Sequence, residues 1–411
     1  MPLLSGLRVV EIGERGEVAG KLLADVGADV IRVEPPEGAR SRGAGPFAGD
    51  RPDTNMSLTY AFWNTNKRGI TLELSKADAV EAWRRLVASC DVVIDACGPG
   101  GLDALGAGRD QFAGHERLIW CSITPFGLDG PWRDFQTNDL VSIALGGPMM
   151  STGYDDHDLP PIRGDGNQSL AIAGEYAVIG ILSALLQRRS SGRGQLIDVS
   201  IHETVSATTE GAFANWEYFQ RISQRLTGRH AAPASPAPTP KWQIECADGD
   251  YVVLIGAGMP RDERVWANLM DWMAETGADE PLRHLKYREI PRRPEERQPI
   301  IDIIQAFIAT MPAEEVYRRA QDCHLPFGYV RRPEQNLDDP HWHDRGFFLE
   351  GEVTGYSGEV LYPGPPYRFS ETPFELNRRA PLLGEHNFEV LVKELGYRPD
   401  QLVALAQSGA V

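Results

Sequence analysis

Short runs of apolar residues alternate with longer amphipathic segments through the first half of the chain. The apolar runs, which are rich in β-branched residues, are LRVVEIG (7–13), DVIRVE (29–34), ITLEL (70–74), DVVIDAC (91–97) and RLIWCSIT (117–124). Segments with the apolar spacing of a helix stand between them, such as KADAVEAWRRLVASC (76–90). A strand, a helix and a second strand at this spacing form a parallel βαβ unit. The pattern therefore predicts an α/β fold with a Rossmann-like, mostly parallel sheet covered by helices.

The first predicted strand lacks the glycine fingerprint of dinucleotide-binding folds. LRVVEIG is followed by Glu14-Arg15-Gly16-Glu17 rather than by G-x-G-x-x-G. In nicotinamide-dependent enzymes those glycines let the backbone approach the pyrophosphate. Their absence argues against a nicotinamide dehydrogenase.

A change of composition near residue 230 predicts a domain boundary. Before it, a helix is expected over 172–189, and a strand followed by one long helix over 196–222. The segment AAPASPAPTP (231–240) cannot continue a helix or a central strand, because Pro removes a backbone donor at every second or third position. We expect a large domain over 1–225 and a smaller α+β domain over 226–335, which opens with a hairpin in 242–257.

Composition and charge exclude several classes of protein. The chain has 411 residues and a formal charge of −17, which disfavours nucleic acid and anionic membrane surfaces as partners. Its five cysteines show neither disulfide nor metal-ligand spacing, so no metal site is expected. Neither a signal peptide nor a sufficiently long apolar span is evident, and we expect a cytoplasmic protein.

Five separated stretches carry a family resemblance. They are LADVGADVIRVEPPEG (23–38), NTNKRGITLEL (64–74), GPGGLDALG (98–106), GILSALLQRRSSGRGQLIDVS (180–200) and RAPLLGEH (379–386). From about residue 5 to about residue 395 the chain resembles the class III CoA-transferases, which include formyl-CoA transferase, carnitine CoA-transferase and the 2-methylacyl-CoA racemases. The resemblance implies CoA exchange between an acyl-CoA and a free carboxylic acid, without a permanently bound cofactor. It also implies that residues 336–411 return to complete the large domain, and that two chains form interlocked rings.

The position of the family's nucleophile is occupied by a leucine. In the family an Asp stands four residues before the first Gly of Gly-x5-Gly-Ile-Leu, which is Gly174 here, so Leu170 takes that place. The Asp attacks the thioester and carries the acyl group covalently, which a leucine cannot do. Asp165 is the fallback carboxylate and Glu175 a weaker one, but attack needs atoms within roughly 3–3.5 Å in line. A racemase would need the same Asp.

The CoA site implied by the resemblance is only partly retained. Its expected contacts are Arg40, Arg42, Leu72, Cys97, Gly98 and Leu105. Arg32, Arg40, Arg42, Lys67 and Arg68 could form a phosphate-binding cluster, or they could be solvated surface charges. The family pattern is lost at Ala39, Ala96 and Ala104, and the turn over 13–17 is about two residues short.

These features together predict that this chain is the non-nucleophilic subunit of a heteromer. Within the family the chain most resembles the subunit without this Asp in succinyl-CoA:benzylsuccinate CoA-transferase, so succinyl-CoA and an aromatic succinate are candidate substrates. The expected partner is a homologous chain that carries the Asp. Two alternatives stay open: an active homodimer that uses Asp165, and a non-catalytic acyl-CoA-binding protein.

Overall fold

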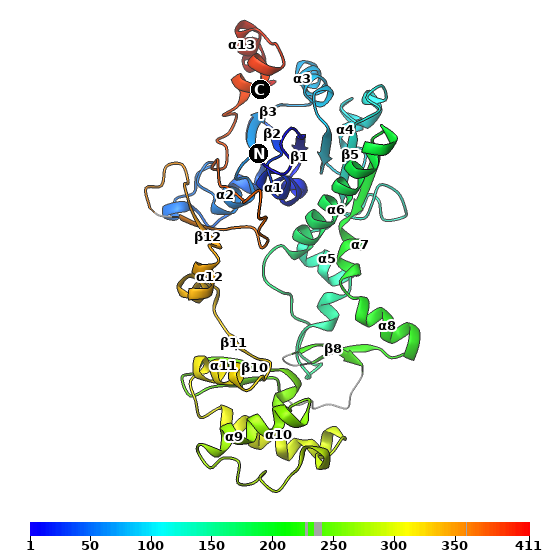
Figure 1. Cartoon of the computed structure of the whole chain (residues 1–411). Helices are drawn as coiled ribbons and strands as arrows, with labels where there is room; N and C mark the ends of the chain where they lie inside the picture. Colours follow the sequence, from blue (N-terminus) through cyan, green and yellow to red (C-terminus); the bar gives the residue numbers. More distant parts are fainter. Residues whose placement is uncertain (227–228, 234–240, 359) are drawn as a thin grey trace. The chain divides into compact units, whose positions relative to one another are not determined.

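The chain divides into two compact units. The computed structural model describes residues 1–226, 229–233, 241–358 and 360–411. One unit consists of residues 1–147, 164–208 and 341–411, and the other of residues 148–163 and 209–340. The blue and red ends of the chain thus belong to the same unit (Figure 1). The expected domain limits at 225/226 and 335/336 stay a prediction about independently folding domains.

The first unit is built on a six-stranded parallel sheet. Its strands are β1 (Arg8–Ile12), β2 (Asp29–Glu34), β3 (Arg68–Thr71), β4 (Val92–Asp95), β5 (Ile119–Thr124) and β6 (Leu196–Ser200). They pair in the order β3-β2-β1-β4-β5-β6, the doubly wound Rossmann order. Central strands such as β4 and β5 are buried along their whole length, which explains their continuous apolar runs. The predicted parallel sheet is confirmed, with the third strand two residues earlier than expected.

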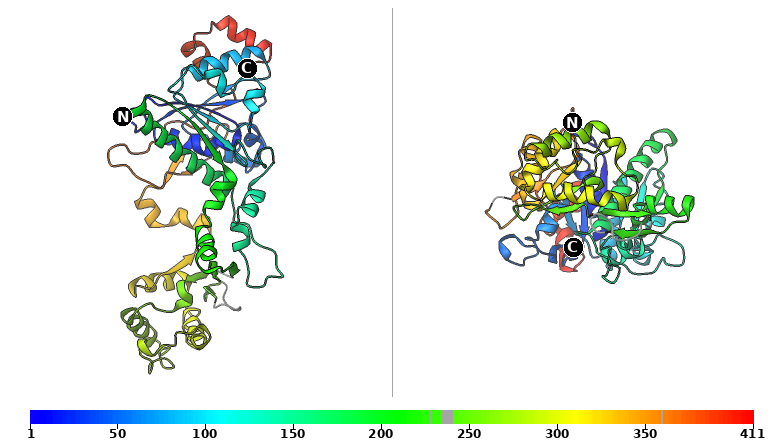
Figure 2. Two further views of the ribbon diagram at one scale, coloured as in Figure 1. Left: turned by 90° about the vertical axis from the view of Figure 1, so that its right-hand side faces the viewer. Right: turned by 90° about the horizontal axis from the view of Figure 1, so that it is seen from below.

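Helices pack on the sheet through their apolar faces. The unit contains α1 (Glu17–Asp25), α2 (Leu58–Trp63), α3 (Ala77–Ala88), α4 (Gly101–Ala104), α5 (Asp139–Leu145), α6 (Gln168–Ser191), α7 (Ile201–Ala207), α12 (Pro340–Asp344) and α13 (Pro399–Gln407). Trp83 of α3 is fully buried, and its indole Nε1 donates to the Ala107 carbonyl at 2.8 Å. Leu405 of α13 belongs to the same core, so the C-terminal helix lies beside α3 (Figure 2).

The long helix α6 has one face of small residues and one of large exposed residues. Ala173, Gly174 and Ala177 are buried, and a Cβ on Gly174 would lie 2.5 Å from Val18 of α1. By length and composition α6 could cross a membrane, yet this buried face packs as a helix that covers a sheet. The opposite face exposes Tyr176, Ile179, Leu182 and Leu186 to solvent.

The second unit has an antiparallel sheet with helices. Strands β9 (Gln243–Glu245), β10 (Tyr251–Leu254) and β11 (Phe327–Val330) pair in the order β11-β10-β9, which confirms the expected hairpin. Its other elements are α8 (Glu210–Phe219), β7 (Ser223–Leu226), β8 (Arg229–Pro233), α9 (Glu263–Ala274), α10 (Pro294–Ile308) and α11 (Ala313–Asp322). A further two-stranded sheet, β12 (Phe348–Gly351) with β13 (Val360–Pro363), belongs to the returning segment of the first unit.

The segments 201–222 and 231–240 were predicted to form one long helix and a domain crossing. The single long helix expected over 201–222 is wrong, because the chain forms α7 and α8 with a break at Thr208 and Thr209. The Thr208 hydroxyl donates to the Val205 carbonyl at 2.7 Å, a local bond that competes with helix continuation. Of the Pro-rich segment 231–240, the first three residues end β8, and 234–240 lie outside the described residues.

A buried ion network joins β1, β2 and the start of β3. The Glu11 carboxylate contacts both Arg32 and Lys67, and the Lys67 Nζ–Glu11 Oε2 distance is 2.8 Å. Arg32 also contacts Glu17 at 2.5 Å, and all three of Glu11, Arg32 and Lys67 are at most 1% exposed. In β2, Glu34 accepts hydrogen bonds from Arg42 Nε and Nη2 at 2.6 and 2.7 Å. Burial raises the pKa of Glu34, but the Arg42 hydrogen bonds, the charges of Arg32 and Arg42 and the Ala39 N–H together lower it by more, so the net pKa lies below its usual value.

We predict that Glu11→Gln strongly destabilises the protein. The substitution preserves shape but leaves two buried cations without their shared anion, which costs about 3–5 kcal/mol. Urea unfolding should detect this loss. The matched control is Glu81→Gln, because Glu81 is exposed and pairs with Arg85 at 3.0 Å on the surface of α3; its cost should stay below about 1 kcal/mol. Equal losses in the two variants would contradict the structural role of the network.

Candidate active site

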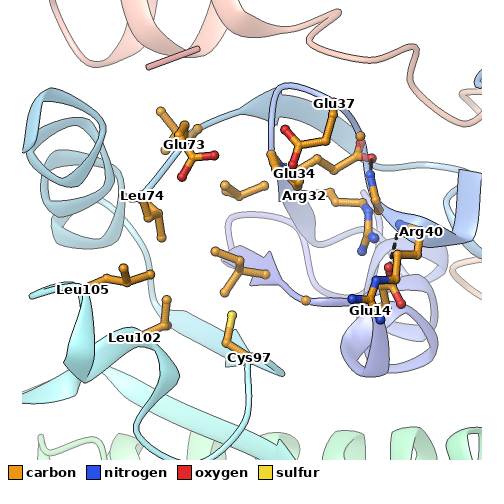
Figure 3. A pocket seen from close by; sticks show the side chains of 17 residues that line it. Glu14, Arg32, Glu34, Glu37, Arg40, Glu73, Leu74, Cys97, Leu102 and Leu105 are labelled. Atoms are coloured by element: carbon orange, nitrogen blue, oxygen red, sulfur yellow. Dashed lines mark hydrogen bonds between the residues drawn. The ribbon is translucent and has the colours of Figure 1, made fainter. Parts of the chain in front are cut away.

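A cavity lies at the carboxyl ends of the first four strands. It has a volume of about 470 Å³ and is lined by the segments that follow β1, β2, β3 and β4 (Figure 3). In doubly wound sheets, ligands bind where the strand order reverses, which is between β1 and β4 here. We call this space the strand-end cavity.

One side of the strand-end cavity is an apolar slot. Leu74 after β3 faces Leu102 and Leu105 around α4, and the Cys97 thiol lies near these side chains (Figure 3). Leu72 also lines this cavity. Slots of this kind suit a flat, weakly polar ring. Four of the expected CoA contacts therefore line one cavity: Arg40, Leu72, Cys97 and Leu105. Gly98 follows Cys97 with a φ of 93°, where a side chain would be strained.

Most of the candidate phosphate-binding cations are used inside the protein. Arg32, Arg42 and Lys67 belong to the buried ion network. Arg68 pairs with Asp29 at 2.6 Å and with Glu389 at 2.8 Å. Of the five basic residues considered from the sequence, Arg40 alone has an exposed side chain beside the cavity. The expected cluster of cations thus reduces to one.

The rim of the strand-end cavity is acidic. Glu37 and Glu73 lie together at one edge, and Arg40 lies beside Glu14 at the other (Figure 3). The Ser75 N–H donates to Glu73 Oε1 at 3.0 Å, and hydrogen bonding from Ser75 lowers the pKa of Glu73, so this carboxyl is ionised at neutral pH. Lys76 adds a smaller attraction to Glu73 from outside the cavity wall. This edge repels phosphate groups.

A second cavity adjoins the first and contains Leu170. It has a volume of about 410 Å³ and shares Gly13, Glu14 and Arg40 with the strand-end cavity. A Cβ on Gly13 would lie 2.7 Å from the Ala96 carbonyl, so only glycine lets these two strand ends approach. Leu170 lies in the first turn of α6, half-buried, and lines this space, which we call the Leu170 cavity.

Neither substitute carboxylate identified from the sequence lines the Leu170 cavity. Asp165 and Glu175 are both exposed and lie outside its wall. The acids that do line it are Glu14 and Asp139, and the Asp139 Oδ1 accepts the Ser169 N–H at 2.8 Å. Asp139 thereby caps the start of α6, just before Leu170. Sequence reasoning missed this residue, although Asn138-Asp139 before an apolar run is a helix-start signal.

A buried carboxyl lies between the ends of β4 and β5. Asp95 Oδ1 accepts the Cys97 N–H at 3.0 Å, and Oδ2 accepts the Trp120 indole N–H at 3.3 Å. Burial raises the pKa of Asp95 to about 6 despite these bonds. Desolvation and the neighbouring Asp95 charge also raise the pKa of Cys97, so its thiol in the cleft is protonated and weakly nucleophilic at neutral pH.

The titration of Asp95 predicts a pH-dependent effect of Asp95→Asn. Its pKa of about 6 in the folded protein exceeds that of the unfolded chain, near 3.9, so the wild type loses stability as pH rises through this interval. Asn cannot ionise. Its stability relative to wild type should improve by about 1–1.5 kcal/mol between pH 5 and pH 7.5.

Asp400→Asn is the matched control for this pH dependence. Arg398 lowers the pKa of Asp400, so its titration is complete below pH 5. Denaturant titrations at the two pH values should show no such change for this variant. A pH-independent effect of Asp95→Asn would contradict the raised pKa.

Among the described residues, no group of three or more His, Cys, Asp or Glu side chains could hold a metal ion. The cleft therefore offers apolar walls, one accessible arginine beside its mouth and an acidic rim.

Comparisons with known proteins agree with this architecture. The chain is 33% identical to the protein named succinyl-CoA:(R)-benzylsuccinate CoA-transferase subunit BbsE of Thauera aromatica, over 99% of this chain and 98% of that one. It is 30% identical to formyl-CoA:oxalate CoA-transferase of Streptomyces avermitilis, over 99% of both chains. The structure resembles a crystal structure of a CAIB/BAIF family protein from Brucella suis, with a TM-score of 0.80 and 26% identity over 95% of this chain and 99% of that one.

A family model establishes the assignment. The model of CoA-transferase family III matches residues 4–387, which span both units. The chain belongs to CoA-transferase family III, and the two relatives named above are CoA-transferases.

Proposed function

We propose that this chain is the non-nucleophilic subunit of a heteromeric class III CoA-transferase. The observation that carries the proposal is Leu170, which lines the cavity beside the strand-end cleft while Asp165 and Glu175 lie outside it. Without a carboxylate at that place, no acyl-enzyme can form there. The chemistry then belongs to a homologous partner chain with Asp at this position.

The charge of the strand-end cavity also supports a non-catalytic role for this chain beside a catalytic partner. CoA carries a 3′-phosphate and a pyrophosphate, and their recognition depends on positioned cations. Here three of the candidate cations neutralise buried acids, and Glu37 and Glu73 occupy one edge of the cavity. We infer that this chain holds acyl-CoA weakly and that the partner supplies the productive CoA site.

The substrates are proposed from the similarity to a named relative. The relative from Thauera aromatica is named for succinyl-CoA and benzylsuccinate. We propose succinyl-CoA as donor and an aromatic succinate as acceptor for the assembled enzyme, which would act in the cytoplasm. Transfer between two carboxylic acids would then use the partner's Asp.

An exposed apolar helix face supports association. Tyr176, Ile179 and Leu186 lie on one side of α6 and are 45%, 60% and 64% exposed. Their spacing of three and seven residues puts them on the same helical stripe. Apolar stripes of this size are usually covered in assemblies. We propose that a homologous subunit covers this face in an interlocked-ring dimer.

Trapping of the covalent intermediate tests the proposed function. The isolated chain is incubated with succinyl-CoA, quenched with hydroxylamine and digested for mass spectrometry. We expect no modified carboxylate in this chain, and modification of the partner's Asp when the two subunits are co-folded. An adduct on Glu14, Asp139, Asp165 or Glu175 would overturn the proposal and favour an active homodimer.

A pair of matched variants completes that test. Replacing the partner's Asp by Leu should abolish transfer by the heteromer, whereas Leu170→Asp in this chain should leave the rate of the heteromer within about twofold. The second expectation follows because Ala96 and the shortened 13–17 turn still line the Leu170 cavity. A Leu170→Asp chain that turns over alone would show that its CoA site is intact.

We also predict that removing the rim charges improves CoA binding. Each exposed like charge near a phosphate costs about 0.5–1 kcal/mol, so Glu37→Gln with Glu73→Gln should tighten CoA binding to the isolated chain roughly five- to thirtyfold. Calorimetry at low salt should detect the gain, and added salt should reduce it. The control, Glu81→Gln with Glu116→Gln, alters two acids outside the cavity. An unchanged affinity in the rim variant would contradict the role assigned to its charge.

A further inference from the structure

A third cavity lies in the returning segment of the first unit, away from the strand-end cleft. It has a volume of about 580 Å³, and its wall consists of residues from 341–349 and 364–374. The pairing of β12 with β13 brings these two stretches together, and the Gly364 N–H donates to the Phe347 carbonyl at 2.7 Å. A Cβ on Gly364 would lie 2.8 Å from that carbonyl oxygen, so glycine permits the approach. We call this space the return-segment cavity.

Aromatic rings form much of its wall. The aromatic residues that line it are Trp342, Phe347, Tyr367, Phe369 and Phe374. Trp342 and Phe347 have ring centroids 4.6 Å apart, and Tyr367 and Phe369 pack edge to face at 5.4 Å. Tyr367 and Phe369 are 39% and 41% exposed, so their faces are available to a ligand. Such a wall favours a flat aromatic ring through offset or edge-to-face contacts.

The polar part of the wall is cationic. Arg345 and Arg368 both line the cavity, and no Asp or Glu does. Asp344 and Glu371, which are close in sequence, lie outside the wall. Neither guanidinium makes an ion pair with any residue that the structure describes. In a chain with a net charge of −17, two arginines without a facing acid are conspicuous. Arginine binds carboxylates through paired, charge-assisted hydrogen bonds.

We propose that the return-segment cavity binds an aromatic carboxylate. The ring would lie against the aromatic wall, and the carboxylate would accept hydrogen bonds from Arg345 and Arg368. Its volume falls within the range of small-molecule sites, about 300–1,000 Å³. The site is separate from the Leu170 cavity and shares no residue with it or with the strand-end cavity. The proposal therefore does not depend on which subunit carries the nucleophile.

Isothermal titration of the full chain with three probes tests the proposed chemistry. Phthalate offers a ring and two carboxylates, phthalamide keeps the ring without charge, and succinate keeps the carboxylates without the ring. We expect phthalate to bind at least tenfold more tightly than either other probe. Equal affinity for phthalate and phthalamide would overturn the role of the arginines, and equal affinity for succinate would overturn that of the rings. Absence of phthalate binding would overturn the site altogether.

Variants locate the binding. Arg345→Gln and Arg368→Gln should each weaken phthalate binding about tenfold, the value of one charge-assisted interaction of about 1.4 kcal/mol, and Arg345→Lys should retain part of the affinity. Arg40→Gln in the strand-end cavity and Arg318→Gln on α11 should leave it within twofold. Circular dichroism shows that each variant is folded. Loss of binding in Arg40→Gln alone would move the ligand to the strand-end cavity and overturn the proposal.

Titration of the assembled protein distinguishes a small-molecule site from a surface that a protein segment covers. The same titration is repeated after co-folding with the Asp-bearing homologue. We expect phthalate binding to persist with the same dependence on Arg345. If assembly abolishes binding while the isolated chain still binds, a protein segment covers the cavity in the heteromer, and the small-molecule proposal is overturned.

Discussion

The buried ion network beneath the strand-end cavity constrains both the fold and the chemistry of this chain. Three acids, Glu11, Glu17 and Glu34, face three bases, Arg32, Arg42 and Lys67. The set is neutral, which is the condition for burying so many charges in a protein interior. Because the acids sit on β1, α1 and β2, the network fixes the spacing of the strand ends that form the cavity. The bases cannot also serve a ligand.

Because these bases are paired inside the protein, the strand-end cavity keeps its apolar wall while Arg40 alone of the candidate cations is exposed beside it. The apolar slot depends on Leu72, Leu74, Leu102 and Leu105, which are anchored by the sheet and α4. The cations that would complete a nucleotide site are turned inward, and Glu37 and Glu73 stand at the rim. Shape and charge are thus maintained by different residues. The charge at the rim can change while the shape of the cavity is kept, because the rim is solvated and contributes little to stability.

The sequence predicted the elements better than it predicted the site. Strand positions followed from apolar runs, since a strand in a parallel sheet is buried on both faces. The pairing of Glu11 with Lys67 joins residues 56 positions apart, and no local pattern indicates it. The role of Asp139 was not predicted for the same reason, because it accepts a hydrogen bond from Ser169, 30 positions away in the sequence. Leu170, by contrast, was recognised because a short motif fixes its distance from Gly174. The break between α7 and α8 depends on local Thr208 bonding, which opposed the helical pattern.

The substitution at Leu170 is compatible with an intact fold because the packing of α6 depends on other positions. Gly174 and Ala177 hold the helix against its neighbours, and Asp139 caps its first turn. Leu170 projects into a cavity and is only half-buried, so exchanging a carboxylate for an apolar side chain there leaves no buried charge unpaired. The helix start can therefore change from reactive to inert while the exposed face of α6 stays available to a partner. Leu170 and the exposed face with Ile179 and Leu186 lie on opposite sides of one helix, so a change of side chain at Leu170 leaves that exposed face unaltered.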